Sequence, residues 1–235
     1  MSARVKKGQR HDGAAGVLGM LVGGAAALLS GCGLLGGNNS CRFKMTVEVE
    51  TSEGLKTGSS VYEVLAFKTS ELITGGTSSD STLKGEAVDV PGGRTLFALL
   101  KTVNTSGHDD LAYMSMRTLD PAFNYNRVES TNRISAGDGI KSPNDVPATD
   151  YPMLVTFGDI DDPKSVQRVD PASLAASFGP GIRLKRITVE VTDDDVATGI
   201  EKRLRWLDHL EQYRTQRTNP FTSTLPNEIG YLRRR

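Results

Sequence analysis

Several residue types on which binding sites are commonly built are scarce in this chain of 235 residues. It has two cysteines, three histidines and one tryptophan, and aromatic residues make up 6% of it. A zinc site of the Cys/His type therefore lacks ligands, and there is no His-Glu-x-x-His arrangement. The sequence also lacks a phosphate-binding loop and a Gly-x-Ser-x-Gly nucleophile motif, so it predicts no metal, no cofactor and no catalytic residues.

The charge balance excludes a further class of function. Residues 1–31 hold four of the 28 Lys/Arg and one of the 28 Asp/Glu, so the rest of the chain carries 24 basic and 27 acidic residues, a net charge of −3. General nucleic-acid binding requires a basic face. We therefore expect no nucleic-acid partner, and the few aromatic residues argue against a large stacking surface for bases or sugars.

The first residues carry the parts of a bacterial export signal. A positively charged start, with Arg4 and Arg10 at its ends, precedes the apolar stretch 14–29, and Leu29-Ser30-Gly31-Cys32 then resembles a lipobox. This pattern predicts a signal peptide over 1–31, acylation of Cys32 with chains such as palmitate, and a lipidated tether over 32–41. Several acyl chains together give stable membrane anchoring.

The position after the cysteine bears on the destination. Gly33 replaces the aspartate that retains many lipoproteins in the inner membrane, so the outer membrane, facing the periplasm, is the preferred site in the cell envelope. Two alternatives stay open for the same segment. It could remain as an uncleaved transmembrane helix, although its Gly-Gly pairs are poor in helices, or it could direct plain secretion.

Acylation of Cys32 has a consequence for the second cysteine. It leaves Cys41 as the only remaining cysteine, so the exported domain would contain no internal disulfide. We interpret Cys41 first as an incidental small residue at the start of a strand. An intermolecular disulfide between anchored copies, or a reactive role, are the alternatives.

The region 42–208 is predicted to be a single α+β domain, mainly antiparallel sheet with short C-terminal helices. Residues 43–50 alternate strictly between apolar and polar, as in a half-buried strand, and pair with a second strand over 59–68. A second hairpin is expected from 83–90 and 94–103 around Pro91-Gly92-Gly93. The apolar run 151–157 indicates a central strand, and 165–169 and 182–192 two more, the last with a β-bulge at Lys185-Arg186.

Helices and loops complete this prediction. One helix is expected to begin at Asp170-Pro171 and end at Gly179, and another to follow Asp193, Asp194 and Asp195, with Ile200, Leu204 and Leu207 on one face. The stretch 111–119 is apolar but ambiguous. Residues 69–82 are expected to be a loop, residues 124–150 a long polar loop, and residues 209–235 a polar, disordered tail ending in three arginines.

Several blocks resemble a family of uncharacterised proteobacterial exported proteins. They include Tyr151-Pro152-Met153-Leu154-Val155-Thr156-Phe157 and Arg186-Ile187-Thr188-Val189-Glu190-Val191-Thr192, and the likeness covers most of 42–208. The resemblance implies a bacterial source and one coherent domain. It implies no activity and no catalytic residues.

One polar cluster is the best candidate for chemistry. It comprises His108 and the acids Asp150, Asp159, Asp161 and Asp162. Carboxylates beside a histidine could act as a general acid and base, and an oxygen-rich loop could bind calcium, but the EF-hand spacing fails. Turn formation and helix capping are the simpler explanations for these acids.

The sequence thus predicts a lipid-anchored envelope protein, held in the membrane by its N-terminal lipid, that is a non-enzymatic binding or assembly module with an envelope protein as partner. The alternative is a periplasmic hydrolase that uses the carboxylates around Asp150–Asp162. The two differ in one geometric expectation, because a hydrolase needs these acids and His108 to converge in one cleft.

Overall fold

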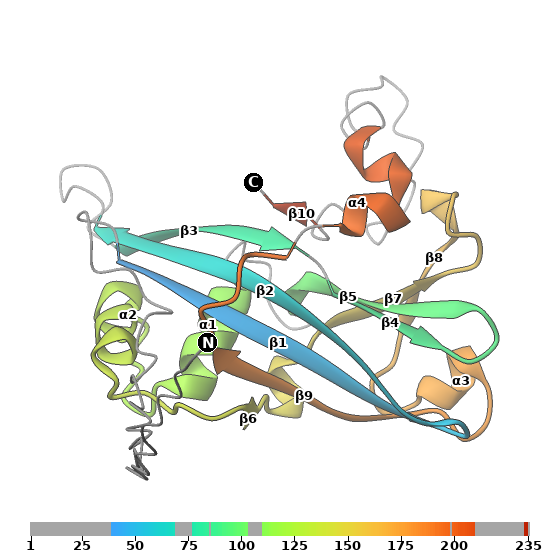
Figure 1. The fold of residues 1–235 in the computed structure, drawn as a ribbon, viewed down its shortest axis with the longest axis horizontal. Coiled ribbons are helices and arrows are strands. Elements are labelled where there is room, and N and C mark those ends of the chain that lie inside the picture. The colour runs from blue at the N-terminus through green and yellow to red at the C-terminus, as the bar shows by residue number, and fades with distance from the viewer. Residues whose placement is uncertain are drawn as a thin grey trace, which may run out of the picture.

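The computed structural model describes residues 39–68, 77–84, 86–102, 110–197, 199–209 and 233–234. They form two antiparallel sheets with helices, which confirms the α+β class. In Figure 1, helices α1 (Asp110–Leu119) and α2 (Arg127–Ala136) lie together beside the larger sheet, and α4 (Ile200–Arg203) lies above the smaller one. The expected signal peptide and most of the tether lie outside the described residues.

The larger sheet has the strand order β10-β3-β2-β1-β9-β6. Its long central members are joined by antiparallel pairing of β1 with β2 on one side and with β9 on the other. The bounds of the six strands are β1 (Asn39–Thr51), β2 (Gly54–Lys68), β3 (Thr77–Lys84), β6 (Asn144–Asp145), β9 (Arg183–Val191) and β10 (Arg233–Arg234).

The smaller sheet has the order β4-β5-β7-β8. Its central strand β7 is buried at all six positions, as the apolar run predicted. The bounds are β4 (Glu86–Val90), β5 (Arg94–Thr102), β7 (Pro152–Phe157) and β8 (Val166–Val169). The turn of the predicted second hairpin is also confirmed, with Gly92 and Gly93 both at positive φ, where residues with a side chain are strained.

Two hydrophobic cores lie on opposite faces of this smaller sheet. The first core lies between the two sheets and α1, and it takes the apolar face of β1, namely Cys41, Phe43, Met45, Val47 and Val49. The second core lies between the smaller sheet and the C-terminal helices, and it consists of Phe97, Leu99, Met153, Val155, Phe157, Val166, Ile200, Leu204, Trp206 and Leu207. The smaller sheet is therefore a middle layer with no polar face.

Helix α1 explains the ambiguous apolar stretch 111–119. Leu111, Met114 and Leu119 are completely buried in the first core. Inside the core, the hydroxyl of Tyr62 on β2 donates a hydrogen bond to Ser115, which in turn donates to the carbonyl of Leu111. Burial raises the pKa of Tyr62, so this hydroxyl stays protonated and satisfied.

The predicted β-bulge at the start of β9 is confirmed, and it brings two basic side chains to one carboxylate. Register between β1 and β9 shifts between Glu48 and Val49, which leaves Lys185 as the extra residue. A bulge redirects side chains, and here both Lys185 and Arg186 approach the carboxylate of Glu48, at 2.8 Å each. The hydrogen bond from Arg186 and then that from Lys185 lower the pKa of Glu48 to about 2.

This cluster predicts an acid-sensitive part of the stability. Because the folded pKa of Glu48 lies below its ordinary value of 4.5, its contribution is present in full above that value and is lost as the pH falls toward about 2. Its partners are partly exposed, so we expect Glu48→Gln to lower the free energy of unfolding by about 1 to 2 kcal/mol at neutral pH. Urea titrations at several pH values should show this difference shrinking to nothing near pH 2. A difference that stays constant with pH would contradict the assignment to this carboxylate.

Three predicted loops or tails contain regular structure instead. Residues 124–150 include α2, the short strand β6 and a 3₁₀ helix at Ala148–Asp150, so the prediction of a long polar loop there was wrong. Part of the predicted loop 69–82 is strand β3, because polar Ser and Thr residues pair along β2. In the predicted disordered tail, Arg233 and Arg234 pair with β3 as β10. The rest of the tail from 210 on lies outside the described residues.

The predicted helix starts were also partly wrong. The first short helix, α3 (Leu174–Phe178), begins after Ser173 rather than at Asp170-Pro171, because Asp170 caps the turn at Ala172 instead. Gly179 ends it at φ 104, as expected. A 3₁₀ helix at Arg205–His209 follows α4.

Residues Asp193–Asp195 do not start a helix. Asp194 pairs with Lys44 and Asp195 with Arg42, so the chain after β9 passes across the polar face of β1 before α4 begins at Ile200 (Figure 1). No helix within the described residues is long and apolar enough to cross a membrane.

The surroundings of Cys41 differ from the expectation of a domain with no internal disulfide. The Cys41 sulfur is disulfide-bonded, and its partner lies outside the described residues. The sulfur is fully buried against α2, 3.8 Å from the carbonyl oxygen of Thr131 and 3.7 Å from the hydroxyl of Ser135. The sequence has one other cysteine, Cys32, which lies outside the described residues.

Candidate functional site

The acids singled out from the sequence do not come together. Asp150 lies just before β7, whereas Asp159, Asp161 and Asp162 lie in the turn that follows it. The six residues of β7 separate the two groups by about 20 Å, at 3.3 Å per residue. His108 lies outside the described residues.

Each acid has a structural role of its own. Asp150 accepts a hydrogen bond of 2.9 Å from Arg117 of α1. Asp159 accepts from the backbone N–H of Asp161, and Asp162 caps the following 3₁₀ helix by accepting from the N–H of Lys164. Within the described residues no group of three His, Cys, Asp or Glu side chains is placed to hold a metal ion. Turn formation therefore accounts for the turn acids.

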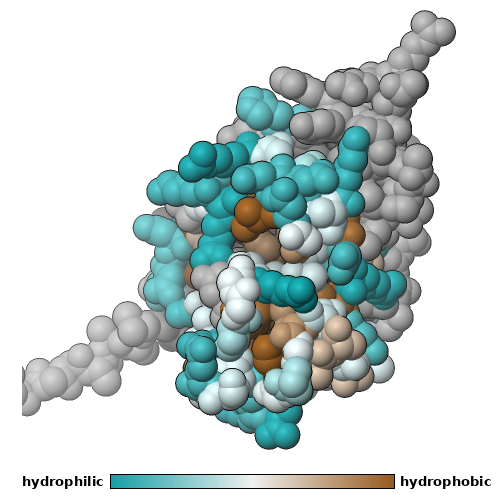
Figure 2. Space-filling view, turned by 90° about the vertical axis from the view of Figure 1, so that its right-hand side faces the viewer, coloured by the Kyte–Doolittle hydropathy of each residue, from teal (hydrophilic) through white to brown (hydrophobic). Residues whose placement is uncertain are grey.

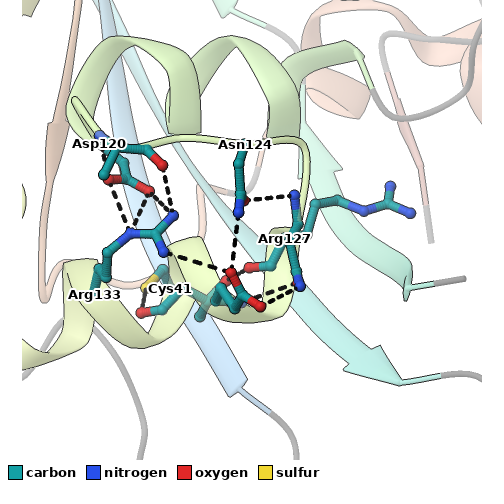
Figure 3. Close-up of polar contacts among 9 residues, drawn as sticks. Cys41, Asp120, Asn124, Arg127 and Arg133 are labelled. Carbon is teal, nitrogen blue, oxygen red and sulfur yellow. Dashed lines mark hydrogen bonds and ion pairs between the residues drawn. The ribbon is translucent and has the colours of Figure 1, made fainter.

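The feature that the sequence did not reveal is the connection between α1 and α2, residues 120–126, here called the α1–α2 corner. It begins with Asp120, whose carboxylate is 2% exposed and accepts hydrogen bonds from Arg133 of α2 at 2.8 to 3.2 Å. Burial raises the pKa of Asp120, but the hydrogen bonds from Arg133 and from the backbone N–H of Ala122, with the positive charge of Arg133, are among the effects that together outweigh burial and hold that pKa below the ordinary value. The pair fixes the end of one helix to the body of the next (Figure 3).

The start of α2 is fixed by a second polar group. Asn126 is the N-cap and accepts a hydrogen bond from the N–H of Glu129, while the Glu129 carboxylate accepts from the side-chain amides of Asn124 and Asn126. This reciprocal arrangement resembles a capping box, except that Glu129 takes the side-chain amide of Asn126 and the backbone N–H of Asn126 donates to Asn124. Gly137, at φ 87, ends the helix. The polar atoms of the corner are thus mostly used to hold the corner itself.

Three aromatic rings gather on the outside of the corner. Phe123 and Tyr125 lie 5.3 Å apart, and Tyr113 of α1 lies 5.9 Å and 6.1 Å from them. The guanidinium of Arg127 lies 5.0 Å from the centre of the Tyr113 ring. Tyr125 is 67% exposed and has a φ of 65°, which is unusual for a residue with a side chain. The structure therefore presents one aromatic ring to the outside from a rigid base.

The opposite end of the molecule carries a second apolar area. Leu55, at the β1–β2 turn, is 49% exposed, and Ile160, in the β7–β8 turn, is 38% exposed. Figure 2 views this end, and hydrophobic residues appear there among hydrophilic ones. Exposed large apolar residues within the described part of the chain are thus found at both ends of the long sheet.

One signal in the sequence could have located the corner. Asn126 and Glu129 have capping-box spacing, and Gly137 follows at the distance of a short helix, so together they indicate α2. The aromatic cluster has no such signal, because its residues come from a helix and an irregular connection.

No family model, no curated protein and no solved structure matches this chain.

Proposed function

We propose that this protein is a lipid-anchored protein of the bacterial cell envelope, and we favour the outer membrane over the inner membrane as its location. We also propose that its domain acts by binding or assembly rather than by catalysis. The observation that carries the location is the string Leu29-Ser30-Gly31-Cys32 after a charged start and an apolar stretch. The separation of the candidate acids supports the non-enzymatic part, because a hydrolase needs them in one cleft.

The two cysteines provide the sharpest test of the anchor. A sulfur atom that carries diacylglycerol cannot also form a disulfide, so acylation of Cys32 and a bond from Cys32 to Cys41 are mutually exclusive states. If the protein is a lipoprotein, Cys32 of the mature protein carries the lipid. If Cys32 instead forms a disulfide in the mature protein, the chain is not processed as a lipoprotein. Mass spectrometry of the N-terminal peptide distinguishes the two directly.

We expect Cys32→Ala to abolish labelling with a fatty-acid probe and to release the protein from membranes, because the acyl chains would be its anchor. Cys41→Ala is the matched control and should keep both the label and the membrane association. Unchanged membrane association of the Cys32→Ala variant would refute lipidation as the anchor.

The binding role is supported by the kind of surface that the domain presents. Exposed aromatic residues on a rigid base are typical of contact surfaces, since tyrosine buries a large area with little loss of side-chain freedom. The α1–α2 corner is such a surface, and the exposed aliphatic residues Leu55 and Ile160 lie at the opposite end. They lie on different sides of the molecule, so an anchored domain could use one toward the membrane and the other toward an envelope partner.

A further inference from the structure

We infer that the α1–α2 corner contacts the lipid bilayer to which the protein is anchored, with Tyr125 at the membrane–water interface, and so orients the domain on the membrane. This inference rests on the proposed lipid anchor. It goes further by assigning a surface, a partner and an orientation to the anchored domain.

The length of chain between the anchor and the domain restricts the orientation. From Cys32 to Asn39, where β1 begins, there are seven steps of the chain, which span about 25 Å at most when fully extended. The start of β1 must therefore stay close to the bilayer surface. Elements that pack beside that start are the ones that can reach the membrane.

The α1–α2 corner is such an element. Close to the start of β1, Cys41 contacts α2 at Thr131 and Ser135. Thr131 lies four residues into α2, about 6 Å along its axis, and Tyr125 precedes the helix by two residues. Figure 3 shows the start of α2 and Cys41 in the same close-up. The other end of β1 is about 40 Å away, given its 13 residues.

The chemistry of the corner suits the interface of a bilayer. Tyrosine is enriched at the membrane–water boundary, where its ring meets the acyl region and its hydroxyl stays hydrated. Residues 120–133, which are the corner and the first two turns of α2, include two acidic and two basic residues, so this segment carries no net charge. Within it, Arg133 pairs with both carboxylates, Asp120 and Glu129. A neutral aromatic corner needs no anionic lipid, in contrast to a polybasic membrane site.

The test uses the acylated full chain reconstituted into phosphatidylcholine vesicles with brominated or ordinary acyl chains. Tyr125→Trp places a fluorescent reporter at the corner, and Leu55→Trp places one on an exposed position at the other end of β1. Trp206 is buried and common to both variants, so its signal is subtracted. We expect brominated lipid to quench the reporter at position 125 and to leave the reporter at position 55 unchanged, equally with and without added phosphatidylglycerol.

Each other outcome overturns the inference. Acylated protein with no quenching at position 125 means that the corner faces water or a protein partner, and the proposed anchor survives. Equal quenching at positions 125 and 55 means that the domain has no fixed orientation. Quenching that requires phosphatidylglycerol contradicts a neutral contact. A chain without an acyl group, shown by its mass before reconstitution, refutes the proposed anchor and the inference with it.

Discussion

Replacing Arg133 with alanine should lower the free energy of unfolding by about 3 kcal/mol, because it leaves a buried carboxylate without its partner. The Asp120 side chain is 2% exposed, and Arg133 provides two nitrogen atoms to it. Removing one member of a buried ion pair is more damaging than removing both, since the remaining charge must be dehydrated alone or protonated. Urea unfolding followed by circular dichroism measures the loss.

Arg117 provides a matched control for this prediction. It too donates to a single aspartate, Asp150, at 2.9 Å, but that aspartate is 20% exposed. Water can replace the lost partner there, so Arg117→Ala should cost at most about 1 kcal/mol. The double variant Asp120→Ala with Arg133→Ala should lose less than the sum of the single variants. If Arg117→Ala and Arg133→Ala lower the free energy of unfolding equally, burial of the aspartate does not decide the cost of losing its arginine.

Replacing Trp206 with alanine should cost about 3 to 5 kcal/mol, because it removes the largest side chain of the second core. The Trp206 ring lies 5.5 Å from that of Phe157, and its indole N–H donates a hydrogen bond of 2.8 Å to the carbonyl of Ile160. The substitution thus removes both the packing against β7 and the hydrogen bond that fastens the C-terminal helices to the β7–β8 turn.

A second variant separates these two contributions. Trp206→Phe keeps much of the apolar contact and loses the donor, so we expect it to cost about 1 to 2 kcal/mol. Circular dichroism is the suitable probe because the chain has no other tryptophan. Hydrogen exchange should rise first in β5 and β7 of the Trp206→Ala variant. If the amide hydrogens of β1 exchange as early as those of β7, the second core does not unfold independently of the first.

The strands that could be predicted are those in which one physical cause dominates. Alternation along 43–50 reflects one buried face of β1, and the continuous apolar run at 152–157 reflects burial of β7 on both faces. The bulge at Lys185 could be predicted because a change of alternation phase within one strand requires an extra residue.

The missed elements depend on partners that are distant in sequence. Helix α2 has few apolar residues, and it is held by its N-cap Asn126 and by the bond from Arg133 to Asp120. Strand β3 is polar and forms because β2 offers a free edge. Asp194 has the composition of a helix start but pairs with Lys44, 150 positions earlier in the chain. The left-handed backbone of Tyr125 has no local signature at all.

The position of the smaller sheet as a middle layer has a consequence for how the protein is made. Synthesis proceeds from the N-terminus, so Phe97, Met153 and Val155 are complete long before Trp206 and Leu207 leave the ribosome. During that interval one apolar face of β5 and β7 has nothing to cover it, and such a face is prone to aggregate. We expect purified chains that end near residue 195 to aggregate on refolding, and chains that extend past residue 209 to refold without aggregating.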